Sequence, residues 1–219
     1  MPSRHFATSQ RNGVTTLTTS WSQDGRDRGA TRMVVIDSTN LLLLLRPGTP
    51  VPGGRDGKAV ERAKERIEYL VHRLSKAKAR IIIPAPALSE ALVKAGAAAS
   101  LQIVEELQKH AVFSIEPFDT RAALEASAMS RAALAGGNKK GKSTAPWQKV
   151  KFDRQIVAIA KVHGATEIYS DDDDVVALGE QAKIKVIRLA ALPLPPEKDQ
   201  LDFLLEPDAD VEATSSDEG

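Results

Sequence analysis

Short apolar runs alternate with amphipathic stretches from residue 33 to about residue 189. Each run is rich in Val and Ile or lies between polar segments, which is typical of buried β-strands. The runs are "MVVID" (33–37), "RIIIP" (80–84), "AVFSIEP" (111–117), "ATEIYS" (165–170) and "IKVIRL" (184–189). Strands spaced by helices imply right-handed crossovers and a mostly parallel sheet covered on both faces. The pattern predicts an α/β fold, a three-layer α/β/α sandwich with five strands.

Between these runs, apolar residues recur at helical spacing. In the stretch 58–78 they lie at positions 60, 63, 67, 70, 71 and 74, as on one face of a helix. Further helices are predicted over 41–45, from Pro86 to about Ala95, and over 101–110, 120–135, 150–163 and 174–182. Asp119 is a suitable N-cap for the helix 120–135, and the pair Gly136-Gly137 ends it. The Gly- and Pro-rich stretch 46–57 and the stretch 136–149 are predicted loops.

The two ends of the chain differ from this middle. Residues 1–32 are rich in Ser, Thr, Arg and Gly without periodicity, which is typical of a disordered or loosely ordered extension, and we interpret Met33 as a candidate native start. Residues 191–219 are first Pro-rich and then acidic, and we expect them to be disordered. Within them "QLDFLL" (200–205) resembles peptides that dock on the bacterial sliding clamp, a weak match because six-residue patterns arise by chance. We therefore expect one folded domain over 33–190.

Composition excludes several classes of protein. The chain has no cysteine, which rules out disulfides, zinc–thiolate sites and thiol catalysis, and fits a reducing cytoplasm. Apolar runs such as 41–45 fall far short of the ~20 residues of a membrane span, and the polar start lacks the pattern of a secretory signal. The net charge of +1 hides an asymmetry, because residues 206–219 contain six acids and no Lys or Arg. Positions 1–205 therefore hold 30 basic against 23 acidic residues, a balance of +7 that suits a polyanionic partner. The simpler interpretation of the acidic end, which we favour, is a solubilising tail.

Acidic residues fall at corresponding places along the strand–helix pattern. Asp37 ends the first strand, Glu90 lies in the helix after the second, and Asp153 lies in the first turn of the helix before the fourth. Four consecutive aspartates, 171–174, directly follow the fourth strand. Because ligands of parallel sheets gather outside the carboxyl ends of the strands, we expect these acids to converge.

Each acid also has a purely structural interpretation. Asp37 can cap the next helix, Asp153 can favour its helix N-terminus, and the Asp run can be a turn. These separate structural roles would all have to apply at once, at matching ends of the strand–helix units. One shared site explains the positions of the acids better. Clustered carboxylates repel one another unless cations neutralise them. Hard oxygen ligands favour Mg²⁺ or Mn²⁺, whereas the absence of Cys and the few His argue against zinc.

The segments "VVIDSTNLLLLL", "IIIPAPALSEAL", "VFSIEPFDTRAALEASAM" and "KFDRQIVAIAKVHGATEIYSDDDDV" together carry a resemblance. In order and spacing they resemble PIN-domain ribonucleases, the fold of the VapC toxins of toxin–antitoxin pairs, over about residues 34–188. The resemblance implies one or two Mg²⁺ or Mn²⁺ ions. It assigns the metal to a set of five carboxylates and the support to two polar residues: Asp37, Glu90, Asp153, Asp172 and Asp174, with Thr39 and Ser170.

Asp171 and Asp173 are then the intervening positions of the signature after the fourth strand. The chain also departs from the family at two places. The family commonly has Asp-Thr-Asn or Asp-Thr-Ser after the first strand, whereas here Asn40 comes one place late. The loops 46–57 and 136–149 are longer than in compact VapC toxins, which weakens the step from nuclease to toxin.

The activity that this resemblance implies is hydrolysis of RNA. Metal ions would polarise a phosphodiester oxygen and lower the pKa of a bound water for in-line attack. The catalytic residues would be Asp37, Glu90, Asp153 and Asp172, with Glu90 orienting the water. The implied partners are RNA, an antitoxin protein and a second copy of the chain, with the helices 58–78 and 101–110 as candidate dimer interfaces.

A basic loop precedes Asp153 and suits a nucleic-acid substrate. Lysines at these positions can contact the phosphate backbone, and a tryptophan can stack on an unpaired base. The candidates are Lys139, Lys140, Lys142, Trp147 and Lys149. The alternative is a solvated loop with Trp147 packed on the core, and the sequence favours neither.

Two rival functions remain open at this point. One is a PIN-like module that binds RNA or protein without cutting, which the full set of acids disfavours. The other is a phosphatase of the haloacid dehalogenase type, which needs a second Asp where Thr39 stands. A phospho-receiver domain needs an acidic pair near the first strand, and this pair is missing too.

Overall fold

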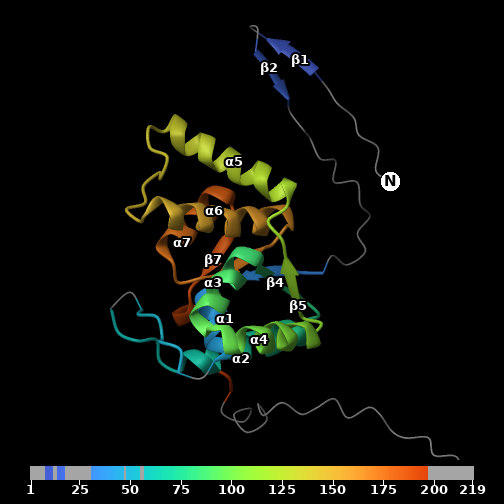
Figure 1. Cartoon of the computed structure of the whole chain (residues 1–219), viewed down its shortest axis with the longest axis vertical. Helices are drawn as coiled ribbons and strands as arrows, with labels where there is room; N and C mark the ends of the chain where they lie inside the picture. Colours follow the sequence, from blue (N-terminus) through green and yellow to red (C-terminus); the bar gives the residue numbers. More distant parts are fainter. Residues whose placement is uncertain (1–7, 12–13, 18–30, 47, 55–56, 197–219) are drawn as a thin grey trace, which may run out of the picture. The chain divides into compact units, whose positions relative to one another are not determined.

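The structure of the chain is a computed structural model that describes residues 8–11, 14–17, 31–46, 48–54 and 57–196. The chain divides into two compact units, residues 1–30 and residues 31–219. In the first unit, β1 (Thr8–Arg11) and β2 (Val14–Leu17) pair antiparallel (Figure 1). The clamp-like segment 200–205 and the acidic residues 206–219 lie outside the described residues. The domain boundaries expected from the sequence therefore stay predictions.

The second unit is built on a five-stranded sheet in which all neighbouring strands are parallel. Its strands are β3 (Met33–Ile36), β4 (Arg80–Pro84), β5 (Phe113–Glu116), β6 (Glu167–Tyr169) and β7 (Lys185–Ile187). Their order is β5-β4-β3-β6-β7, so the first strand lies in the centre. The chain runs outward to β5 and then crosses back to β6 on the other side of β3. The carboxyl ends of β3 and β6 therefore meet where the strand order reverses.

Helices cover both faces of this sheet, which confirms the predicted α/β/α sandwich (Figure 1). Alternate side chains of β3 serve the two layers: Val34 and Ile36 belong to one core, and Val35 belongs to the other. The first core is closed by α1 (Ser38–Leu45), α2 (Ala63–Lys76), α3 (Ala85–Ala95) and α4 (Ala97–Lys109). The second is closed by α5 (Thr120–Ala135), α6 (Trp147–Val162) and α7 (Asp173–Ala182). A 3₁₀ turn at Leu189–Ala191 follows β7.

Most helices match their predicted positions, and the differences lie at their first turns. Helix α1 begins at residue 38 rather than 41, because the Asp37 carboxylate accepts a hydrogen bond from the backbone N–H of Asn40 and so caps it. Helix α2 begins five residues later than predicted, because Arg62 lies in the left-handed region (φ 52°) and interrupts the backbone there. Helix α5 has the predicted N-cap, since Asp119 accepts from the N–H of Ala122.

Close packing of α7 against β7 depends on one residue without a side chain. A Cβ at Gly179 would overlap with the Val186 side chain and lie 3.1 Å from the carbonyl oxygen of Ile184. The glycine therefore lets the helix lie directly on the strand and keeps the chain after β6 close to the sheet. None of the helices among the described residues is long and apolar enough to cross a membrane.

Candidate metal centre

Asp37 lies at the carboxyl end of β3 with both of its carboxylate oxygens engaged. Its Oδ1 accepts from the backbone N–H of Asn40 at 2.9 Å, and its Oδ2 accepts from the hydroxyl of Ser170 at 2.5 Å. Only 6% of the residue is exposed. Burial raises the pKa of Asp37 to about 6, although both hydrogen bonds oppose the rise. Asp37 is thus both the helix cap and a buried carboxyl at the edge of the sheet.

Ser170 connects the ends of the two central strands. It is fully buried directly after β6, and besides donating to Asp37 it accepts from the backbone N–H of Asp172 at 3.1 Å. Asp172 in turn caps α7, because its Oδ1 accepts from the N–H of Asp174 at 2.8 Å. These bonds fix the backbone on which the even-numbered aspartates stand.

Asp153 reaches the same place from α6. It lies in the second turn of that helix and not in the predicted first turn, because α6 begins at residue 147 rather than 150. It is surrounded by buried residues, and 6% of it is exposed. One carboxylate oxygen from each of Asp153, Asp172 and Asp174 lies within 4.8 Å of the other two. We call these three residues the acidic cluster.

The side chain of Lys149 enters the acidic cluster. Its Nζ lies 2.9 Å from Asp153 Oδ2, 2.6 Å from Asp172 Oδ2 and 3.3 Å from Asp174 Oδ2. Burial lowers the pKa of Lys149, but hydrogen bonds to Asp172 and Asp153 outweigh it, and the pKa lies above its ordinary value. Burial raises the pKa of Asp153 to about 6 against the pull of Lys149. The cluster therefore holds a fixed positive charge.

Glu90 lies on α3, in the same pocket. Its Oε2 accepts from the Ser38 hydroxyl at 2.8 Å, and its Oε1 lies 2.8 Å from the Lys94 ammonium. Burial acts to raise the pKa of Glu90, but the hydrogen bonds from Lys94 and Ser38 prevail and leave it below the ordinary value. Glu90 is therefore a charged carboxylate held in place from two sides.

One pocket of about 660 Å³ joins these groups. Its acidic lining includes Asp37, Glu90, Asp153, Asp171 and Asp172, and Thr39 lies beside them. Asp174 and Ser170 are absent from the lining, and Ser170 is buried. Apolar side chains complete the wall, and they include those of Pro52, Val93, Phe152, Ile156 and Val175. The structure thus brings all four predicted catalytic carboxylates to one pocket.

Comparison with known proteins places this arrangement in a family. The PIN domain profile matches residues 55–181, more than half of the chain. The chain belongs to the PIN-domain family. No curated protein sequence matches it.

Solved structures with a similar fold include VapC proteins. One is a DNA-bound VapBC from Salmonella typhimurium, with 17% identity, a TM-score of 0.46, and 73% of this chain and 99% of that chain covered. Another is VapC20 of Mycobacterium tuberculosis, named as a toxin that cleaves the sarcin–ricin loop. It shares 14% identity at a TM-score of 0.44, with 67% of this chain and 95% of that chain covered.

The odd-numbered aspartates of this PIN domain have other partners. The side chain of Asp173 is 92% exposed and pairs with Arg188. Asp171 lines the pocket, but its carboxylate accepts from the backbone N–H of Leu189, at 3.2 Å for the nearer oxygen. This difference arises because Asp172 caps α7. At the start of the helix, the side chains of neighbouring residues point in different directions. The even-numbered pair alone reaches the acidic cluster.

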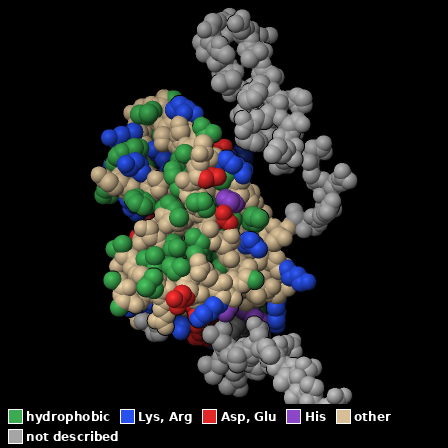
Figure 2. Space-filling view, turned by 45° about the vertical axis from the view of Figure 1, so that its right-hand side comes forward, with side chains coloured by type: hydrophobic (Ala, Val, Ile, Leu, Met, Phe, Trp, Pro, Cys, Tyr) green, Lys and Arg blue, Asp and Glu red, His purple; other side chains and the backbone are tan. Residues whose placement is uncertain are grey.

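The basic loop of the PIN domain is folded back onto α6. Two cations lie over the ring of Trp147, with Lys139 Nζ at 5.2 Å and the Arg154 guanidinium at 5.3 Å from its centroid. Buried Arg154 also donates to the carbonyl of Lys139 at 2.6 Å, and Lys140 donates to the carbonyl of Ala145 at 3.0 Å. Figure 2 shows Lys and Arg side chains gathered at the upper left, where Figure 1 draws the segment between α5 and α6. Trp147 is not among the residues that line the acidic pocket, whereas Phe152 is.

Sequence reasoning did not single out three residues of this region. Ser38 holds Glu90, Arg154 ties the basic loop to α6, and Phe152 forms part of the pocket wall. Only Ser38 carried a signal in the sequence, because its hydroxyl comes directly after Asp37. Asn40 lies fully buried in the first turn of α1, and its side-chain amide has no hydrogen-bond partner among the described residues.

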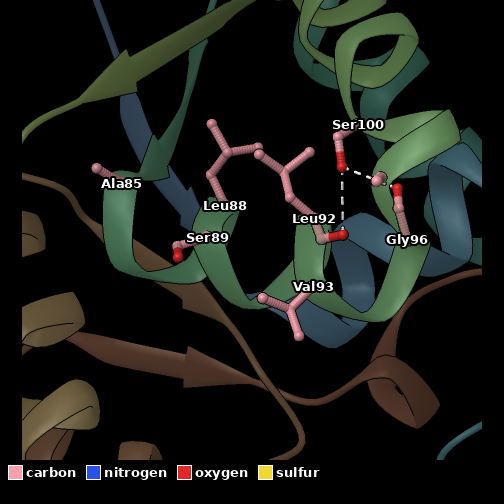
Figure 3. A pocket seen from close by; sticks show the side chains of 8 residues that line it. Ala85, Leu88, Ser89, Leu92, Val93, Gly96 and Ser100 are labelled. Atoms are coloured by element: carbon pink, nitrogen blue, oxygen red, sulfur yellow. Dashed lines mark hydrogen bonds between the residues drawn. The ribbon is translucent and has the colours of Figure 1, made fainter.

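A second, apolar groove adjoins the pocket between α3 and α4. It has a volume of about 440 Å³, and its wall includes Leu88, Leu92 and Val93 (Figure 3). The hydroxyl of Ser100 donates to the carbonyls of Gly96 and Leu92 and joins the two helices (Figure 3). Val93 is 78% exposed and lines both the groove and the acidic pocket. An apolar surface thus continues directly into the acidic pocket.

Proposed function

We propose that this PIN-domain protein is a metal-dependent endoribonuclease that hydrolyses phosphodiester bonds. The observation that carries the proposal is the acidic cluster, in which three carboxylates from two distant segments lie within 4.8 Å. The cluster lies beside Asp37 at the place where the strand order reverses, the usual ligand site of open parallel sheets. PIN domains are typically ribonucleases, which supports the same activity.

The donor set suits Mg²⁺ or Mn²⁺. Every candidate ligand is a carboxylate oxygen, the type of ligand that these hard cations prefer. The cluster already accommodates one cationic group, the ammonium of Lys149. Asp153, Asp172 and Asp174 would hold the ion, with Asp37 and Glu90 in the same pocket. When bound, the metal supplies Lewis-acid chemistry, polarising a phosphodiester oxygen and making a water more acidic.

The neighbouring residues hold the reacting groups in position. Ser170 and the N–H of Asn40 fix the orientation of the Asp37 carboxylate. Ser38 and Lys94 do the same for Glu90, which is charged and therefore able to accept a hydrogen bond from the attacking water. We assign to Glu90 the orientation of this water and to Asp37 a place beside the scissile phosphate.

The surroundings of the pocket support RNA as the substrate. Phe152 is 46% exposed in the pocket wall and offers a flat surface on which an unpaired base can stack. The exposed lysines Lys139 and Lys142 lie on the basic loop that leads into α6, where they can contact the phosphate backbone. An unpaired strand that passes along the pocket would meet both surfaces.

A toxin of a toxin–antitoxin pair is the narrower form of this proposal. An antitoxin would then be a protein partner. The exposed apolar side chain of Leu101 on α4 is a candidate contact for a homodimer.

The cytoplasm is the proposed location, in keeping with a chain that has no cysteine. Growth arrest on expression, relieved by the product of an adjacent gene, is the expected result for a toxin.

Cleavage of RNA by the Asp153→Asn variant tests the nuclease directly. We expect wild-type cleavage to require Mg²⁺ or Mn²⁺ and to fall by at least about a hundredfold in the variant, because one carboxylate of the acidic cluster is lost. Asp173→Asn is the matched control, since it removes the same charge from an exposed neighbour, and it should cleave as the wild type does.

Other outcomes of this assay point to the rival functions. RNA binding without cleavage in any divalent cation would identify an inactive PIN module. Hydrolysis of phosphomonoesters with intact RNA would identify a phosphatase. Equal cleavage by wild type and Asp153→Asn would remove the acidic cluster from the reaction.

A further inference from the structure

Lys149 makes more contacts with acids than its place on α6 requires. A lysine one turn before Asp153 would form an ordinary i,i+4 ion pair with that residue alone. Here the ammonium also lies 2.6 Å from Asp172 Oδ2 and 3.3 Å from Asp174 Oδ2, on a segment that follows β6. The side chain is 41% exposed, so it reaches the cluster from the open side of the pocket. Its charge therefore faces three carboxylates at once.

This placement solves an electrostatic problem of the metal-free protein. Three carboxylate oxygens within 4.8 Å of one another repel, and the repulsion is strong where water is partly excluded. The ammonium is a compact cation with three donors, enough to give one hydrogen bond to each of the three aspartates. It therefore neutralises the oxygens that a divalent ion would need.

We propose that Lys149 is a built-in counter-cation, which holds the acidic cluster together before metal binds and leaves it when a divalent ion enters. This inference rests on the proposed function, because it takes the same cluster as the metal site. An ion bound at about 2.0–2.6 Å from these oxygens occupies the space on which the ammonium is centred. The two cations also repel each other, so the oxygens serve one or the other.

Because Lys149 must be displaced, the affinity for the metal ion depends on how strongly the lysine binds the acidic cluster. Whatever free energy the three contacts contribute to the metal-free protein is subtracted from metal binding, since the two occupants exclude each other. Below a certain concentration of the divalent ion, the Lys149 ammonium therefore remains bound to the three aspartates. Lys149 lines the pocket, so the displaced ammonium has open space to move into.

Calorimetric titration of the full chain with Mn²⁺, after removal of metals and without RNA, tests the competition. Lys149→Met keeps the length of the side chain and removes its charge, and we expect Mn²⁺ to bind at least about tenfold more tightly. Lys151→Met is the matched control, because it removes the same charge from an exposed position on the same helix. It should change the dissociation constant by less than about twofold.

A second measurement on the wild-type chain tests the displacement itself. An amine-reactive reagent followed by mass spectrometry should modify Lys149 slowly without metal and at least about threefold faster with saturating Mg²⁺. The modification of Lys151 should not change. Because no variant is needed, this arm holds even if Lys149→Met fails to fold.

The results separate this inference from the proposed function. Equal Mn²⁺ affinity of Lys149→Met and Lys151→Met, or unchanged reactivity of Lys149 in Mg²⁺, overturns the counter-cation role while the nuclease stands. If wild type and both variants bind no Mn²⁺ at all, the metal site of the proposed nuclease falls with it.

Discussion

At the scale of the residue, Asp37 has two tasks that act against each other. As a cap it satisfies the N–H of Asn40 and so helps to start α1. As a buried carboxyl it costs stability when it is charged, because burial raises its pKa to about 6. A divalent ion nearby would favour the charged form again. In the metal-free protein, the charged form of Asp37 therefore lowers the free energy of unfolding.

The unfolding free energy of the metal-free protein should reveal this cost through its dependence on pH. The pKa of Asp37 is higher in the folded state, so its contribution to stability is present below the ordinary value of 3.8 and is lost as the pH rises through about 6. Urea unfolding in EDTA should show Asp37→Asn gaining on the wild type by up to roughly 3 kcal/mol between pH 4 and pH 7. A difference between the two proteins that does not change with pH would contradict this.

Phe152 offers a second test at the same scale. Base–aromatic stacking is worth about 1–3 kcal/mol per base, so Phe152→Ala should raise KM for single-stranded RNA by about tenfold and leave kcat within about twofold. Phe152→Tyr keeps the ring and should behave as the wild type. Leu124→Ala removes an exposed apolar side chain on α5 and serves as the control. Equal losses in the Ala and Tyr variants would point to a structural role instead.

The sequence predicts the acids of the pocket but not their surroundings. Asp37, Asp153 and Asp172 were predictable because they follow a strand or face the core from a helix, positions that the sequence pattern marks. Glu90 is exposed on α3 and was marked only by its place in the helix after the second strand.

The place of Lys149 was not predictable, because its distance from Asp172 and Asp174 depends on how α6 packs beside the segment after β6. The interaction of Trp147 with Arg154 likewise arises from tertiary contacts between helix and loop.

At the scale of the element, α7 and β7 hold the aspartate segment against the sheet. Gly179 leaves no room for a methyl group between this helix and Val186. Strands and helix cores were well predicted, since buried runs and helical spacing are read from neighbouring residues. The first turns of the helices were predicted less well, because each depends on the backbone conformation of a single residue, such as Arg62.

Gly179→Ala should lower the unfolding free energy by about 1–3 kcal/mol, because overpacking of a close contact forces the helix away from the strand. Gly136→Ala is the matched control. A Cβ at that position meets only carbonyl oxygens at ordinary distance, 3.4 Å and 3.7 Å, and Gly136 has a negative φ of −79°. Urea unfolding of both variants at one pH checks the prediction, and equal stability would argue against tight packing of α7.

At the scale of the whole molecule, charge is unevenly divided along the chain. Residues 206–219 carry six acids, and the rest of the chain has a balance of +7. A nucleic acid is attracted by the basic part of the chain and repelled by the acidic residues 206–219. Both interactions weaken as the salt concentration rises.

Deletion of residues 206–219 should tighten RNA binding by about three- to tenfold at low ionic strength, and the gain should vanish near 1 M salt. Fluorescence anisotropy with the Asp153→Asn chain measures binding without cleavage. A tail of the same length in which amides replace the six acids is the control and should bind like the deletion. A gain with the deletion alone would assign the effect to bulk rather than charge.

The central place of β3 has a consequence for biosynthesis. This strand leaves the ribosome first among the five, yet one of its two neighbours, β6, is made only after β4, β5 and the six helices α1 to α6. Ser170 and the even-numbered aspartates emerge later still. A nascent chain therefore carries Asp37 before the Ser170 hydroxyl that bonds it has been made, and the acidic cluster cannot form until residue 174 has been added.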